Sequence, residues 1–103
     1  MPTLVQFDFP MQGPWGDEMA DAYRELAELI AAAPGLRWKV WTENSETREG
    51  GGIYLFDDDA SAEAYIAEHT ARLEGFGVTE IRARLFQVNE PLTEVTHGPL
   101  TTA

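Results

Sequence analysis

The stretch Leu36–Phe56, LRWKVWTENSETREGGGIYLF, decides the fold. Residues 36–43 alternate in the manner of a strand and are apolar on both faces, and residues 44–49 are polar. Three glycines then lead into the short apolar run Ile53–Phe56, which is typical of a strand buried on both faces. The stretch therefore predicts two strands joined by a hairpin loop in the middle of the chain.

The segments outward from this hairpin predict one strand and one helix on each side. Before it lie a strand at 3–9, a loop at 10–16 and a helix at 17–33 that ends at the Pro-Gly pair 34–35. After it, three aspartates at 57–59 supply the cap and first turn of a second helix, and a long strand follows at 78–89 until Pro91. The apolar stripe of the second helix consists of Ala62, Tyr65, Ile66, His69 and Leu73.

The resulting order β-α-β-β-α-β predicts an α+β, ferredoxin-like sandwich with both helices on one face of a four-stranded antiparallel sheet. We expect this domain to span residues 1–92, followed by a polar tail at 93–103.

The second sheet face needs a cover as well. Val5, Phe7 and Phe9 share one face of the first strand, and both faces of the 36–43 strand are apolar, so we expect side chains too apolar to meet water there. A chain of 103 residues has no third layer to supply. The economical solution is a homodimer, sheet against sheet.

Composition excludes several partner classes. The formal net charge is −11, with 7 Lys and Arg against 18 Asp and Glu, which argues against nucleic acid and against an anionic membrane surface. The absence of Cys excludes disulfides, thiolate catalysis and cysteine metal sites. No apolar run approaches a membrane span and no signal peptide precedes Thr3, so a cytoplasmic location is expected.

Five segments carry a family resemblance, and they run in that family's order. They are GPWGDEMA at 13–20, PGLRWKVWTE at 34–43, GGIYLF at 51–56, HTARL at 69–73 and VNEPL at 88–92. Together they resemble the YdhR-like monooxygenases over residues 3–92. The resemblance implies a dimeric α+β barrel and a monooxygenase-type activity. The related barrel enzymes include oxygenases that act on aromatic or polycyclic substrates without metal or flavin and hold the substrate between sheet and helices.

Oxygen chemistry without a cofactor needs a base, orienting groups and a dry pocket. His69 is the candidate base, with Tyr65 four residues before it on the same helix face and Gln6 on the first strand as orienting groups. The alternative for His69 is a core or helix-end histidine that is hydrogen-bonded to a carbonyl. The alternative for Gln6 is a polar side chain that is solvated or hydrogen-bonded across the strands. Tyr65 has ordinary core packing as its alternative.

Several apolar side chains are candidate walls for a flat aromatic substrate, with ordinary core or dimer packing as the alternative. The candidates are Trp38, Tyr54, Trp15, Met19 and Phe86. Trp38 and Trp41 alternate in the strand, so at most one of them lines any one pocket. The loop that holds Trp15 is a candidate lid. Lys39, Arg82 and Arg84 are candidate anion binders, with ion pairing as the alternative.

No metal or nucleotide motif is present. His69 and His97 are the only histidines, the acids at 57–59 lack the calcium-loop pattern, and the glycines at 50–52 lack the lysine of a phosphate loop. We therefore expect no metal and no cofactor, with flavin left open.

These observations lead to one main hypothesis and two alternatives. The main hypothesis is a homodimeric, cofactor-independent monooxygenase that uses dioxygen on a small hydroxyaromatic or quinol-like substrate. The alternatives are a non-oxidative isomerase or dehydratase of the same fold, and a binding module for small aromatic ligands without catalysis.

Overall fold

The computed structural model describes residues 2–101. The elements follow in the order β1 (Thr3–Pro10), α1 (Gly16–Ala22), α2 (Arg24–Ala31), β2 (Leu36–Asn44), β3 (Glu49–Phe56), α3 (Asp59–Gly75), β4 (Arg82–Gln87) and α4 (Glu90–Val95). The strands form one four-stranded sheet in the order β2-β3-β1-β4, and each neighbouring pair is antiparallel. This order confirms the predicted ferredoxin-like α+β fold.

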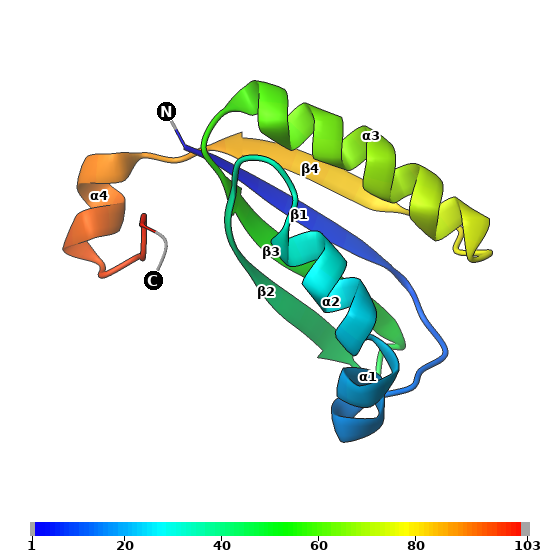
Figure 1. The fold of residues 1–103 in the computed structure, drawn as a ribbon. Helices are drawn as coiled ribbons and strands as arrows, with labels where there is room; N and C mark the ends of the chain where they lie inside the picture. Colours follow the sequence, from blue (N-terminus) through cyan, green and yellow to red (C-terminus); the bar gives the residue numbers. More distant parts are fainter. Residues whose placement is uncertain (1, 102–103) are drawn as a thin grey trace.

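The helices α1, α2 and α3 lie against one face of the sheet, whereas α4 lies apart from them beyond the strand ends (Figure 1). No helix within residues 2–101 is long and apolar enough to span a bilayer.

The core lies between the sheet and these three helices. Val5, Phe7, Tyr54 and Phe56 point to this face and pack with helix side chains, including those of Ile30, Tyr65 and Leu73. The register supports this arrangement, because Val5 lies opposite Tyr54 on the neighbouring strand. The prediction that Val5, Phe7 and Phe9 contribute to the second face was wrong, because the pleat turns all three toward the helices.

The second face has its own apolar side chains. Alternation along the strands places six of them there: Leu4, Trp38, Val40, Ile53, Leu55 and Phe86. Leu55 is only 1% exposed. The C-terminal segment binds this region, since the Trp38 indole donates to the Pro99 carbonyl (3.1 Å) and Arg37 donates to the Leu100 carbonyl. Val40 and Phe86 stay exposed at 54% and 40%.

The predicted helix at 17–33 is divided into two. Tyr23 has φ −108° and ψ 12°, which ends α1 and precedes α2. The glycines at 50–52 belong to β3, although the sequence suggested that they only lead into it. The fourth strand is shorter than the predicted 78–89 because Glu80 has φ 55°, a left-handed conformation that an extended strand does not contain.

The segment after β4 contains a helix that the sequence did not predict. The Asn89 side chain caps α4 by accepting a hydrogen bond from the Leu92 backbone N–H, and Pro91 lies in the first turn, where proline is tolerated. The expected domain boundary at residue 92 thus falls inside α4. That boundary stays a prediction.

Candidate active site

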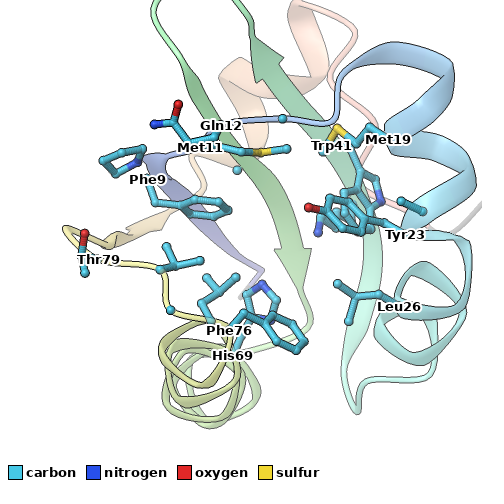
Figure 2. A pocket seen from close by; sticks show the side chains of 18 of the residues that line it. Phe9, Met11, Gln12, Met19, Tyr23, Leu26, Trp41, His69, Phe76 and Thr79 are labelled. Carbon is cyan, nitrogen blue, oxygen red and sulfur yellow. The ribbon is translucent and has the colours of Figure 1, made fainter.

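A cavity of about 680 Å³ lies on the helix-covered face of the sheet. Helices α1 and α2 border it on one side, and α3 borders it on the other. Figure 2 shows His69 reaching in from α3, Tyr23 from the junction of α1 and α2, Leu26 from α2, and Trp41 from β2. The walls are largely apolar and aromatic. Its lining residues include Phe9, Met11, Met19, Tyr23, Leu26, Lys39, Trp41, Tyr54, His69, Leu73 and Phe76. Such a lining suits a flat organic molecule.

Lys39 is the one lysine of the chain, and it lines this cavity. It lies opposite Tyr54 on the neighbouring strand, and its Nζ is 3.3 Å from the centre of the Trp41 ring and 4.7 Å from that of Tyr54. No carboxylate within residues 2–101 forms an ion pair with it. Burial, and then the charge of Arg72, lower the pKa of Lys39 to about 7. A large share of the amine is therefore neutral at physiological pH.

Gly52 makes room for the lysine stem. A Cβ at Gly52 would lie 2.6 Å from Cε of Lys39 and 3.2 Å from Cε1 of Tyr54. The bare backbone of β3 thus lets the stem cross it and carry the amine into the cavity.

His69 is held in one orientation by α3. Its side chain is buried, and the Arg72 guanidinium lies 2.7 Å from Nδ1. Burial, with the charges of Lys39 and Arg72, lowers the pKa of His69 to about 3. Because arginine only donates hydrogen bonds, Nδ1 of the neutral ring accepts, and the ring proton resides on Nε2. This geometry favours His69 as a hydrogen-bond donor over the base that the sequence suggested.

Two tyrosines next to His69 form a hydrogen bond with each other. The hydroxyl of Tyr65 donates to that of Tyr54 at 3.3 Å, and burial raises the pKa of both phenols. The Tyr65 ring also stacks on His69 with 5.1 Å between ring centres. The predicted sharing of one helix face by Tyr65 and His69 is therefore confirmed, and both hydroxyls stay protonated at neutral pH.

A family model described as "Putative mono-oxygenase ydhR" matches residues 4–99. The chain belongs to this family. The match confirms the resemblance found in the sequence. It also supports the general assignment of the chain as a monooxygenase-type protein. A comparison with curated proteins gives no match.

A solved structure shows a similar fold. It is described as a putative antibiotic biosynthesis monooxygenase from Deinococcus radiodurans, and it is 14% identical with a TM-score of 0.54. The alignment covers 86% of this chain and 93% of that one. At this identity the likeness supports the fold alone.

The ydhR-family chain brings some of the sequence-predicted site residues together and separates others. His69, Tyr54 and Met19 line the cavity. Trp38, Phe86 and Gln6 lie on the opposite sheet face, because their strand positions alternate with those of residues that face the helices. Gln6, which we expected to orient the substrate, therefore points away from the helices and the cavity. Trp15 is not among the lining residues, although Gln12 and Gly13 of its loop are.

The sequence reasoning missed Lys39 and Trp41 as central wall residues. A signal was available, because residues 39 and 41 share a strand face and Lys39 is the only lysine. An irregularity in the register between Leu36 and Trp38 places these two residues on opposite faces of the sheet, since Leu36 lies opposite Phe56 and Trp38 lies opposite Leu55. Arg82, another candidate anion binder, instead pairs with Asp8 and Glu49 on the surface. Within residues 2–101, no three His, Cys, Asp or Glu side chains gather closely enough to hold a metal ion.

Proposed function

We propose that this ydhR-family protein is a cofactor-independent monooxygenase that acts on a small hydroxyaromatic or quinol-like substrate bound between sheet and helices, with Lys39 as the base. The observation that carries the proposal is a free amine inside a largely apolar cavity, in a chain of a mono-oxygenase family. The cavity volume of about 680 Å³ lies within the range of small-molecule sites.

The walls favour a planar substrate. Tyr23 at the junction of α1 and α2 stacks with Trp41 of β2, with 6.4 Å between ring centres, so both the helix layer and the sheet present aromatic surface to the cavity. Aromatic rings pack well against such surfaces in offset or edge-on arrangements.

Lys39 is the group best suited to take the substrate proton. A neutral amine accepts a proton from a phenol or an activated C–H, and the resulting ammonium stays next to the substrate anion. A base with a pKa near the working pH combines the correct protonation state with adequate basicity, and the pKa of Lys39 is lowered to about 7. His69, with its proton on Nε2, then donates a hydrogen bond to the substrate oxygen, while Tyr65 and Tyr54 hold its ring in place.

The substrate itself supplies the electrons for oxygen. The carbanionic form of the substrate transfers electrons to dioxygen, and a C–O bond forms to give a hydroperoxide. Loss of the second C–H proton with cleavage of the O–O bond leaves a carbonyl and releases water. One CH₂ group and one O₂ thus give one C=O and one H₂O, with no external reductant. An apolar cavity protects the reactive intermediates from water.

Oxygen uptake tests the proposal. The purified protein is given a panel of anthrone-like and quinol-like substrates, with and without flavin, and compared with Lys39→Met, His69→Gln and the opposite-face control Trp38→Phe. We expect flavin-independent uptake that Lys39→Met abolishes, His69→Gln weakens and Trp38→Phe retains. Uptake that is unchanged in Lys39→Met would remove Lys39 from the mechanism.

An anaerobic arm separates the alternatives. Turnover that persists without oxygen would favour a non-oxidative isomerase or dehydratase with the same base. Saturable ligand binding with no turnover across the panel would favour a binding module.

The homodimer is part of the proposal. Val40 and Phe86 leave exposed apolar surface on the sheet face opposite the cavity, and the C-terminal segment binds β2 on that face. A second copy of the chain would cover these side chains sheet against sheet, and the cavity would stay on the outer side of each sheet.

A further inference from the structure

Lys39 has a chemistry that proton transfer does not use. It is the only lysine among 103 residues, it extends into a cavity of about 680 Å³, and its amine lies against the Trp41 ring without a carboxylate partner among the described residues. We propose that Lys39 is a covalent carbonyl-binding site, whose amine condenses with an aromatic aldehyde or ketone in the cavity to form an imine. This inference requires the cavity and the amine but no oxygen chemistry.

The surroundings of the amine favour such an adduct. The Nζ atom lies 3.3 Å from the centre of the Trp41 ring and 4.7 Å from that of Tyr54, so an aryl imine formed there would extend along aromatic surface. Apolar lining such as Phe9, Met11 and Leu26 limits water, which would hydrolyse the imine. A desolvated lysine in an apolar pocket is the usual form of an imine-forming amine.

The charged groups around Lys39 leave its amine free to react. Arg72 of α3 disfavours the ammonium, His69 is neutral, and Tyr54 of β3 stays protonated. Glu25 of α2 is the one carboxylate in the cavity lining, and its residue is exposed. With the pKa of Lys39 lowered to about 7, about half of the amine is neutral at pH 7, against roughly 1 in 3,000 for an ordinary lysine.

The reaction balances without a co-reactant. Nζ attacks the carbonyl carbon and the C=O π bond opens to a carbinolamine. The C–O bond then breaks as the C=N bond forms. The carbonyl oxygen leaves as water with the two amine protons, so no oxidant or reductant takes part.

Reductive trapping tests the inference, and the absence of other lysines makes the test clean. The Arg24→Lys variant carries a second, solvent-exposed amine in the same chain, since the Arg24 side chain is 68% exposed. This variant and the wild type are incubated anaerobically at pH 7 with 2-naphthaldehyde and sodium cyanoborohydride, and the adducts are located by peptide mass spectrometry.

We expect at least tenfold more adduct at position 39 than at position 24, with saturation as the aldehyde concentration rises. The preference should disappear in urea, where both amines are exposed. Equal or lower labelling at position 39 in the folded protein would overturn the inference, as would labelling confined to the N-terminal amine. Because no oxygen is present, a failure of the proposed oxygenase activity would not change this result.

Discussion

Two basic side chains, Lys39 and His69, line one apolar cavity, and Arg72 lies behind His69 on α3. Arg72 forms an ion pair with Glu68 on the helix surface. Burial, and then the charge of Arg72, lower the pKa of Lys39 to about 7, and burial, followed by the charges of Lys39 and Arg72, lowers the pKa of His69 to about 3. An amine that is about half neutral at pH 7 and a neutral imidazole thus share the cavity, the amine suited to accept a proton and the imidazole to donate a hydrogen bond.

The pH dependence of the rate distinguishes Lys39 from His69 as the base. A base must be deprotonated to act, so kcat/KM should rise as the pH increases through about 7 if Lys39 acts, since its pKa is about 7. If His69 acted instead, the rise would lie near pH 3. Lys39→Met should lower kcat/KM by about 100-fold or more. The measurement is initial oxygen uptake from pH 5 to 9, and a flat profile would contradict the assignment.

The same pKa shift predicts a pH-dependent stability. The pKa of Lys39 is about 7 in the folded protein and about 10.4 in the unfolded chain. Between these values the unfolded chain binds the extra proton, so stability should rise with pH from 7 to 9, by up to about 1 kcal/mol per pH unit. The lowered pKa of His69 affects stability only below about pH 6.5, and the tyrosines act only above about pH 10.

Urea unfolding at pH 7 and pH 9 measures this slope. Lys39→Met should reduce it, because the variant lacks the shifted group. An equal slope in both proteins would show that Lys39 does not lose its proton on folding.

At the scale of elements, β3 is the central feature, because it lies between β1 and β2 and supplies both core and cavity side chains. Its glycines are packed tightly. A Cβ at Gly51 would lie 2.0 Å from the Phe7 carbonyl oxygen, and a Cβ at Gly50 would lie 2.5 Å from the Met11 sulfur. The close approach of β1 to β3 therefore depends on residues without side chains.

Gly51→Ala should destabilise the fold by about 3 kcal/mol or more, because the added methyl meets backbone that cannot yield without breaking strand pairing. Gly75→Ala is the matched control. It lies at the end of α3 with no atom within 4 Å of the added Cβ, so it should be neutral or stabilising by up to about 1 kcal/mol. Chemical denaturation checks both, and equal stabilities would contradict the packing argument.

At the scale of the whole molecule, the two sheet faces have different roles. The helix-covered face holds the core and the cavity. The other face carries exposed Val40 and Phe86 together with the polar Gln6 and Arg84, and the chain's own C-terminal segment binds at Trp38. A partner on this second face would leave the cavity as it is.

The proposed homodimer can be tested on this face. Val40→Asp places a charge among apolar side chains and should raise the dissociation constant at least tenfold, as measured by light scattering across micromolar concentrations. The control is Leu29→Asp on α2, a similarly exposed apolar residue at 58% against 54% for Val40. A monomeric wild type, or equal effects of both variants, would contradict a dimer through this face.

The sequence by itself determined the order of the four strands and of the helices that cover them, the ferredoxin-like fold and the family, but neither the division of the first helix nor α4. The element order and the fold follow from local alternation, helical spacing and turn residues, and such signals lie within a few neighbouring positions. The family follows instead from the resemblance of the five segments between residues 13 and 92. The common face of His69 and Tyr65 was predictable for the same reason, since four residues make one helical turn.

Only the tertiary structure decided which sheet face lies under the helices, and therefore which residues meet in the cavity. Alternation separates the two faces of a strand but does not say which of them is covered. In the structure, Trp41 lines the cavity in place of Trp38, and Lys39 lines it as well. Gln6 and Phe86 lie on the opposite face and do not line it. The neutral state of Lys39 is also a tertiary property, because burial between sheet and helices and the nearby charge on α3 lower its pKa.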